Sequence, residues 1–109
     1  FTFLDNTADN SSAAGVVLGE WREASDVDLE RLSVVLSDGS HEWRGSSADV
    51  MGSPVKAVAW LSRELARRGR PLPAGSVILT GGMTAPLPLR TGSRVVGNFG
   101  NLGTLEIHG

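Results

Sequence analysis

The sequence predicts an α+β domain that is mainly β, and two observations support this. Glycine accounts for 14 of the 109 residues, which favours short strands and turns over a helical bundle. Residues 53–69 have the apolar spacing of one amphipathic helix, and strand-like segments lie on both sides of it. This order of strands, one helix and further strands is typical of a single unit, residues 1–109, in which the helix packs on a sheet or roll.

The N-terminal residues predict a strand followed by a capped turn. Residues 2–5 alternate weakly between apolar and polar types, which indicates a short strand. Small polar residues over 7–15 indicate a loop or a helical turn capped by Asp9, Asn10 or Ser11. The chain starts with phenylalanine rather than methionine, and we expect it to be the C-terminal portion of a longer polypeptide.

The next segments predict a strand, a surface connection and a hairpin. Residues 16–17 are valines between glycines, which is typical of a short buried strand. Residues 20–30 are polar and are expected to form a surface connection. Residues 32–44 have strand character on both sides of Asp38-Gly39, and this dipeptide is a strong signal for a β-hairpin.

The predicted helix has clear start and stop signals. Ser53 is a good N-cap and Pro54 suits the first helical position. Gly69 is expected to end the helix, and Pro71 prevents its continuation. Spacings of three, three and four residues place on one apolar face the side chains of Val55, Val58, Leu61 and Leu65.

The C-terminal part predicts three more strands. Residues 77–79 form a short apolar run after a turn. A proline-rich edge segment and a turn at Thr91-Gly92 lead to a strand over 94–99. Residues 103–107 supply the last strand.

The composition excludes several classes of protein. The formal net charge is −2, so bulk electrostatics favours neither nucleic acid nor an anionic membrane as a partner. There is no cysteine, which excludes disulfides and thiolate metal sites and fits a cytoplasmic protein. No apolar run approaches the roughly 18 residues of a membrane-spanning helix.

Spaced carboxylates are the first candidates for a metal site. Asp26, Asp28 and Glu30 alternate like oxygen ligands, but they lack the glycine and the terminal glutamate of a calcium loop. A solvated loop is the favoured interpretation, with a metal site as the alternative. Asp5 and Asp9 are expected to cap or brace their turn rather than to bind a metal.

Neither histidine falls in a pattern that indicates nucleophilic catalysis. His41 lies beside the hairpin turn and His108 beside the C-terminus, and both are expected to face solvent or a partner. No Ser–His–Asp arrangement follows from their spacing. Ser12 lacks the G-x-S-x-G context of an activated serine.

The stretch "TGGMT", residues 80–84, is the strongest candidate for a binding loop. Its two glycines let backbone N–H groups approach a ligand closely, and Thr80 and Thr84 add hydroxyls, so the loop could bind a carboxylate. The alternative is a glycine-rich bulge or turn. Lys56 and Arg90 could pair with an anionic substrate, although such residues usually lie on solvated faces.

Three stretches, in order, resemble one family. The first, "DNTADNSSAAGVVLG", resembles a D-x-x-ADN-x-S segment that is followed by a VLG strand. The second, "MGSPVKAVAWL…AGSVILTGG", resembles an AVAWL…IL-[ST]-G block. The third, "FGNLGTLEI", resembles the closing strand. These patterns are those of the 2-keto-4-pentenoate hydratase and 4-oxalocrotonate decarboxylase family, within the fumarylacetoacetate hydrolase superfamily. The resemblance covers nearly the whole chain and is weakest over 20–50.

The resemblance implies a fold and a class of reaction. It implies a β-roll of the fumarylacetoacetate hydrolase type and a Mg²⁺- or Mn²⁺-dependent lyase of aromatic or steroid ring catabolism. In such enzymes the metal chelates a small 2-oxo acid through its carboxylate and adjacent oxygen and acts as a Lewis acid. A partial roll with cut strands would expose apolar edges, so we expect a homo-oligomer or a complex with missing chain or a related subunit.

The resemblance also assigns roles to individual residues. Ser12 matches a serine near the substrate and is the catalytic candidate, while Asp9 and Asn10 match the residues that brace its loop. The loop after the strand supplies the substrate-binding candidates, which are Thr80, Gly81, Gly82 and, more weakly matched, Thr84.

The family's metal ligands are absent from the 109 residues. They are glutamates that lie upstream of the segment matching residue 1, as do the proposed acid–base lysine and aspartate. The chain alone is therefore expected neither to hold the metal nor to turn over substrate.

The leading hypothesis is a hydratase that adds water to 2-hydroxypenta-2,4-dienoate to give 4-hydroxy-2-oxopentanoate in the complete polypeptide. The alternatives are a 4-oxalocrotonate decarboxylase and, from another class, a non-catalytic truncated partner subunit.

Overall fold

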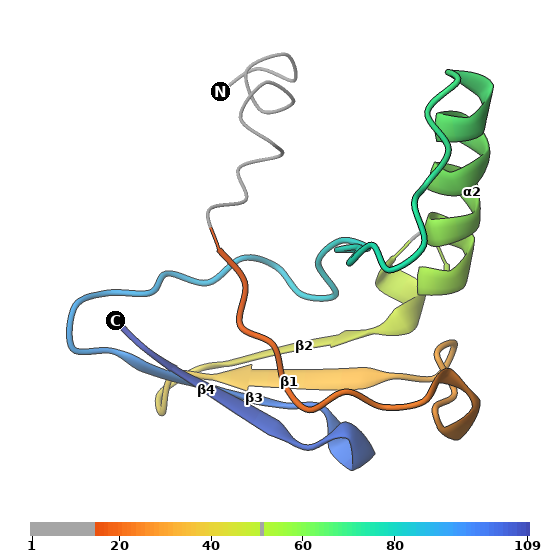
Figure 1. The fold of residues 1–109 in the computed structure, drawn as a ribbon. Coiled ribbons are helices and arrows are strands. Elements are labelled where there is room, and N and C mark those ends of the chain that lie inside the picture. The colour runs from red at the N-terminus through yellow and green to blue at the C-terminus, as the bar shows by residue number, and fades with distance from the viewer. Residues whose placement is uncertain (1–14, 51) are drawn as a thin grey trace.

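The computed structural model describes residues 15–50 and 52–109. Within them, four strands form one antiparallel sheet of order β2-β1-β3-β4, and one long helix lies beside it (Figure 1). The strands are β1 (Ser33–Ser37), β2 (Glu42–Ser46), β3 (Arg94–Asn98) and β4 (Thr104–His108), and the helix is α2 (Pro54–Arg67). Single 3-10 turns are η2 (Ala24–Asp26), η3 (Ser47–Asp49) and η4 (Gly100–Leu102). The predicted α+β class is confirmed.

The predicted hairpin is confirmed as β1 and β2. Its register pairs Ser33 with Ser46 and Ser37 with Glu42, so the connecting loop is residues 38–41. The Asp38 carboxylate closes this loop by accepting hydrogen bonds from the backbone N–H groups of His41 (2.8 Å) and Ser40 (2.9 Å). These two bonds, the one from His41 first, hold the pKa of Asp38 below its ordinary value.

The predicted ends of the helix are also confirmed. The Ser53 hydroxyl accepts a hydrogen bond from the backbone N–H of Val55 at 3.2 Å, and Pro54 is the first helical residue. At the other end, the N–H groups of Gly69 and Arg70 donate to the carbonyls of Ala66 and Leu65, which is the Schellman arrangement. Local capping therefore sets where the helix begins and ends.

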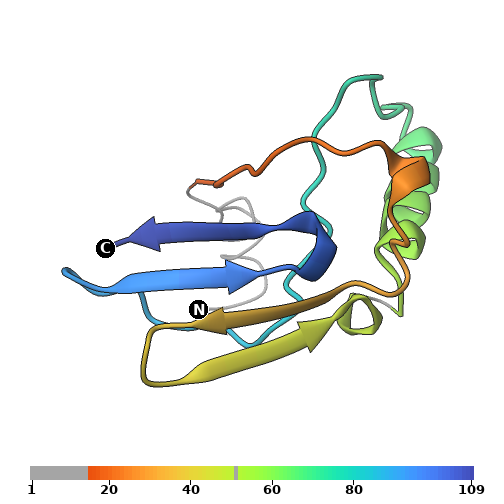
Figure 2. The same ribbon diagram turned by 90° about the horizontal axis from the view of Figure 1, so that it is seen from below.

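The inward face of the sheet is apolar. Val34 and Val95 are 3% and 6% exposed, and both belong to the face that also carries Gly45 and Gly97. Figure 1 shows α2 and the segment 70–90 on one side of the sheet, and Figure 2 shows α2 beyond the ends of the strands. The predicted packing of the helix on the sheet is therefore wrong, because α2 makes almost no contact with any strand. Ala57 is the one buried residue of α2. Val55, which belongs to the predicted apolar face, is 46% exposed, so that face is only partly covered.

Two predicted strands are wrong. Residues 16–17 and 77–79 form no strand, and Val16 and Val77 are 56% and 59% exposed. A β-branched run becomes a strand only where a sheet edge is available to pair with it. The predicted connection over 20–30 is mostly exposed and includes η2. The strand over 2–5 and the turn over 7–14 lie outside the described residues.

The opposite face of the sheet is mostly polar, apart from Val35 and Val96, and carries an ion pair between β3 and β4. Arg94 donates from both Nε and Nη2 to the two carboxylate oxygens of Glu106, at 2.5 and 2.8 Å. His108 Nε2 lies 2.7 Å from the same carboxylate. The hydrogen bond from Arg94 lowers the pKa of Glu106 from 4.5, and the same bond raises the pKa of Arg94.

This ion pair predicts a pH dependence of stability. Because the folded-state pKa of Glu106 is lowered, its contribution is present above 4.5 and is lost as the pH falls through the folded value. The difference in unfolding free energy between the wild type and Glu106→Gln is therefore expected to shrink below pH 4.5. Urea titrations over that pH range measure this difference. The difference between the wild type and Arg94→Gln should also shrink below pH 4.5. A difference that stays constant on acidification would contradict the pairing.

No helix in the described part of the chain is long and apolar enough to cross a bilayer.

Candidate functional site

The predicted binding loop, residues 80–84, lies on the apolar side of the sheet. Gly81 has φ +120°, a backbone conformation that residues with a side chain rarely adopt. Gly81 lies beside Val50: a Cβ added to Gly81 would be 3.8 Å from Val50 Cγ1. The Met83 carbonyl lies directly over Gly45 of β2. The loop is thus irregular backbone that contacts the hairpin, with a bend at residues 83–84, rather than a bulge within a strand.

The hydroxyls of the loop differ in their availability. Thr84 Oγ1 donates to the carbonyl of Ala85 at 2.9 Å, so this hydroxyl is bonded within the loop. Thr80 is half-buried and lines a cavity together with Gly81. Of the two threonines, Thr80 is therefore the better placed to meet a ligand.

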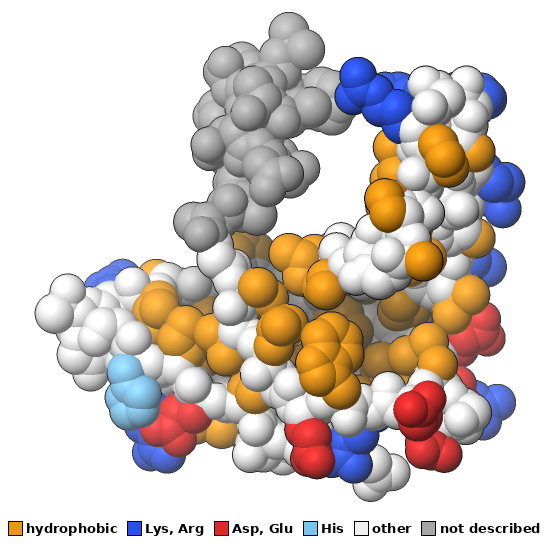
Figure 3. Space-filling model, in the orientation of Figure 1, with side chains coloured by type: hydrophobic (Ala, Val, Ile, Leu, Met, Phe, Trp, Pro, Cys, Tyr) orange, Lys and Arg blue, Asp and Glu red, His pale blue; other side chains and the backbone are white. Residues whose placement is uncertain are grey.

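The cavity beside the loop has a volume of about 680 Å³. One wall is the first two turns of α2, and another is the segment before β1. Figure 3 shows apolar side chains gathered on the inner side of α2 and over the elements below it. The described lining residues are all uncharged: Leu29, Leu32, Pro54, Val55, Val58, Ala59, Ser62, Thr80, Gly81 and Met83.

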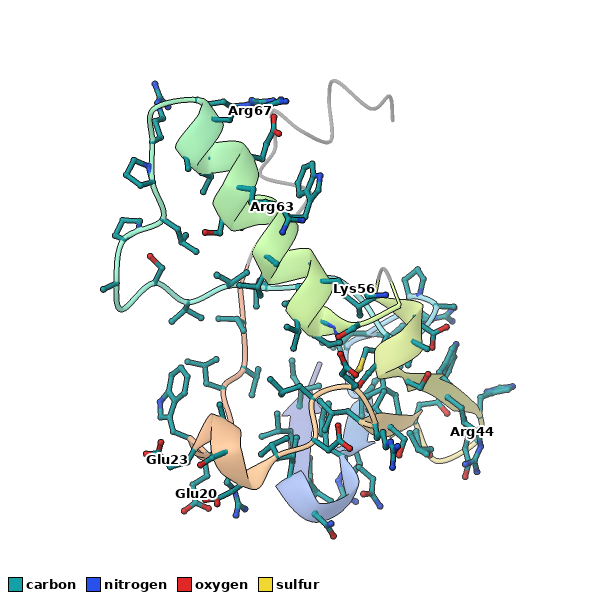
Figure 4. All side chains as sticks on the ribbon, turned by 90° about the vertical axis from the view of Figure 1, so that its right-hand side faces the viewer. Glu20, Glu23, Arg44, Lys56, Arg63 and Arg67 are labelled. Atoms are coloured by element: carbon teal, nitrogen blue, oxygen red, sulfur yellow. The ribbon has the colours of Figure 1, made fainter. Side chains whose placement is uncertain are left out.

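The cations considered as substrate partners lie away from this cavity wall. Lys56 is exposed near the start of α2, and Figure 4 shows it with Arg63 and Arg67 along the helix. Arg90 is exposed, and its backbone N–H donates to Ser93 Oγ at 3.2 Å. Neither Lys56 nor Arg90 is among the described residues that line the cavity.

The described residues do not fit a divalent metal on their own. Residues 15–50 and 52–109 contain no group of three or more histidine, aspartate or glutamate side chains that could hold an ion. Asp28 accepts instead from the backbone N–H of Glu30 at 3.2 Å and lies 3.6 Å from Arg31. Glu30 accepts from the Ser53 hydroxyl at 3.5 Å. The Asp28 carboxylate is thus bonded within its loop, and the Glu30 carboxylate is bonded to the N-cap residue of α2.

The remaining sequence candidates are separated from the loop or lie outside the description. Ser12, Asp9 and Asn10 fall among residues 1–14 and are not described. His41 and His108 have side chains that are 75% and 68% exposed, as predicted. The structure thus brings together Thr80, Gly81 and the wall of α2, a wall that sequence reasoning assigned only to the core.

A comparison with family models decides the relationship of this chain. The model described as fumarylacetoacetate (FAA) hydrolase C-terminal matches residues 2–108. The chain belongs to this family. Its match spans both the binding loop and the undescribed N-terminal residues.

This chain has relatives of three named activities, which are 4-oxalocrotonate decarboxylase, 2-oxo-hept-4-ene-1,7-dioate hydratase and 2-keto-4-pentenoate hydratase. It is 41% identical over 107 residues to a 4-oxalocrotonate decarboxylase from Pseudomonas sp, covering 97% of this chain and 41% of the relative. It is 35% identical over 106 residues to a 2-keto-4-pentenoate hydratase from Burkholderia vietnamiensis, covering 95% and 40%. The predicted membership of the hydratase and decarboxylase family is therefore confirmed.

Solved structures give the same relationship for the fold. The 4-oxalocrotonate decarboxylase from Pseudomonas putida G7, complexed with calcium and acetate, matches with a TM-score of 0.89 at 34% identity. The same enzyme complexed with magnesium and adipate gives 0.88. Each match covers 96% of this chain and 41% of the solved chain. The chain thus spans about two fifths of the length of the relatives that it matches.

Proposed function

We propose that this chain forms part of a hydratase that adds water to a 2-hydroxydienoate with an uncharged tail, 2-hydroxypenta-2,4-dienoate in the simplest case. The observation that carries the proposal is the uncharged cavity beside Thr80 and Gly81. A second carboxylate on the substrate would lose its hydration there without gaining a cation from the described walls. An uncharged vinyl or alkyl tail would instead gain from burial.

In this proposal the loop binds the carboxylate end of the substrate. The backbone N–H groups of Gly81 and Gly82 supply the donors, and the Thr80 hydroxyl adds a third. Ser12 holds the water or a substrate oxygen, and Asp9 and Asn10 brace it. Thr84 supports the loop through its hydrogen bond to Ala85 rather than by touching the ligand.

The metal and the complete fold belong to the same proposal. The described residues do not make a cation site, so we propose that Mg²⁺ or Mn²⁺ is held by glutamates elsewhere in the complete polypeptide. The calcium and magnesium in the solved decarboxylase complexes support a divalent ion. We likewise propose that the sheet completes a β-roll with further chain, in a homo-oligomer or with a related subunit.

Decarboxylation of 4-oxalocrotonate is the second candidate, and the 41% identity to a decarboxylase favours it. The test uses the complete polypeptide with Mg²⁺. Loss of ultraviolet absorbance from 2-hydroxypenta-2,4-dienoate supports the hydratase, and CO₂ release from 4-oxalocrotonate without dienoate hydration overturns it. Inactivity on both substrates would favour a non-catalytic partner subunit.

Ser62→Lys tests the uncharged cavity directly. Ser62 is exposed on α2 and lines the cavity, so lysine adds a cation to the wall without disturbing the core. We expect the kcat/KM for a diacid substrate relative to a monoacid to rise about fivefold, as for a solvent-accessible ion pair. Ala66→Lys, one turn further along and outside the lining, is the control. If the ratio of kcat/KM for diacid over monoacid is equal in the two variants, the cavity is not part of the substrate site.

A further inference from the structure

We propose that Gly45 is a positioning residue for the candidate substrate loop, a role that rests on the proposed function of residues 80–84. Gly45 lies in β2, opposite Val34, and is not among the described residues that line the cavity. Its contribution is the space above its α-carbon, which the loop backbone occupies.

The contact at Gly45 is with backbone rather than with a movable side chain. A Cβ added to Gly45 would overlap the Met83 carbonyl oxygen and crowd its carbon, and it would lie 3.1 Å from Thr84 Cγ2. A side chain could turn aside, but a carbonyl can move only if the peptide units around it move. Any larger residue at position 45 therefore displaces the loop itself.

A second glycine on the same sheet face offers a contrast. Gly97 lies in β3, is buried, and pairs with Leu36. A Cβ there would lie 2.9 Å from Phe99 Cε2 and 3.0 Å from Leu36 Cδ2, which are ends of side chains. Gly97 thus makes room for core packing, whereas Gly45 makes room for the loop.

The other end of the same segment is seated in a similar way. A Cβ on Gly109 would overlap the carbonyl oxygen of Arg90, and the N–H of Gly109 donates to Ser93 at 2.8 Å. The carbonyls of Met83 and Arg90 therefore each lie against a glycine, Gly45 in β2 and Gly109 just after β4. The end at Gly45 adjoins Thr80 and Gly81, and it determines where their polar groups stand relative to the cavity.

The test compares Gly45→Ala with Gly97→Ala in the complete polypeptide. Both add one methyl group to a strand glycine of the same sheet face, so both are expected to lower stability. Only Gly45→Ala should speed hydrogen exchange at residues 80–84 in the native state, measured by mass spectrometry. Only Gly45→Ala should lower kcat/KM, by about 10²-fold and mainly through KM, because ground-state binding of the carboxylate is lost.

A further variant covers the case in which Gly45→Ala does not fold. Thr84→Ser keeps the hydroxyl that bonds to Ala85 and removes only the methyl group nearest Gly45. It is expected to raise exchange in 80–84 and to raise KM by less than Gly45→Ala would.

The readouts separate the positioning role from the proposed function. Exchange in 80–84 that is equal in the Gly45 and Gly97 variants, or unchanged in Thr84→Ser, overturns the role of Gly45 whatever the activity. Faster exchange with an unaltered KM also overturns it. A wild-type protein that is inactive on every 2-hydroxydienoate overturns the proposed function, and the exchange comparison still decides whether Gly45 seats the loop.

Discussion

Replacing Val34 with aspartate is expected to unfold the sheet. Val34 is 3% exposed and lies in β1, the strand that pairs with both β2 and β3. A carboxylate buried at this position without a charge partner costs several kcal/mol, and such a cost is comparable to the whole stability of a small domain, about 5–15 kcal/mol. Circular dichroism during thermal unfolding measures the loss as a lowered or absent transition.

The matched control is Ser33→Asp. Ser33 is the preceding residue of β1, is exposed, and lies on the opposite face of the sheet. Its carboxylate stays hydrated, so we expect a change within about 0.5 kcal/mol, as at ordinary surface positions. Similar losses in the two variants would show that the buried face of β1 is assigned incorrectly.

Gly81→Ala is expected to lower activity about as strongly as Gly45→Ala. At φ +120° an alanine strains the backbone by about 1–3 kcal/mol, and the loop relieves that strain by changing its conformation. The amide groups proposed to bind the carboxylate then move, and a displacement of about 1 Å costs roughly 10²-fold in kcat/KM. Steady-state kinetics of the complete polypeptide measures the effect.

Gly39→Ala separates strain from function. Gly39 has φ +94° in the hairpin loop, and a Cβ there would meet open space, so the backbone strain is comparable. Stability should fall by a similar amount in both variants, whereas activity should fall only in Gly81→Ala. A parallel loss of activity would mean that the kinetic effect reflects stability alone.

The parts of the fold that the sequence predicts are those specified by neighbouring residues. Asp38 caps its own hairpin loop, and Ser53 caps the helix that follows it. The pairing of β1 with β3 joins Val35 to Asn98, and no local pattern carries that information. The same limit explains the two wrong strands, since strand propensity does not reveal whether a pairing edge will be present.

The candidate site divides along similar lines. A family resemblance and the general use of glycines near ligands predict the substrate-binding candidates Thr80, Gly81 and Gly82. The apolar spacing on α2 predicts core rather than a cavity wall, because apolar helix faces usually pack in the core. Gly45 carried a usable signal, since a glycine inside a strand often marks the close approach of another backbone, but its partner could not be named from the sequence.

The strand order has a consequence for how the domain folds. β1–β2 and β3–β4 are each paired over five residues, whereas the seam between β1 and β3 is paired over three. Each hairpin closes a short stretch of chain, but the seam must close around α2 and the long segment after it, which is entropically slower. We therefore expect the two hairpins to form before the seam between them closes. Because Gly45 belongs to the first hairpin, we expect the surface that contacts residues 80–84 to form before the sheet is complete.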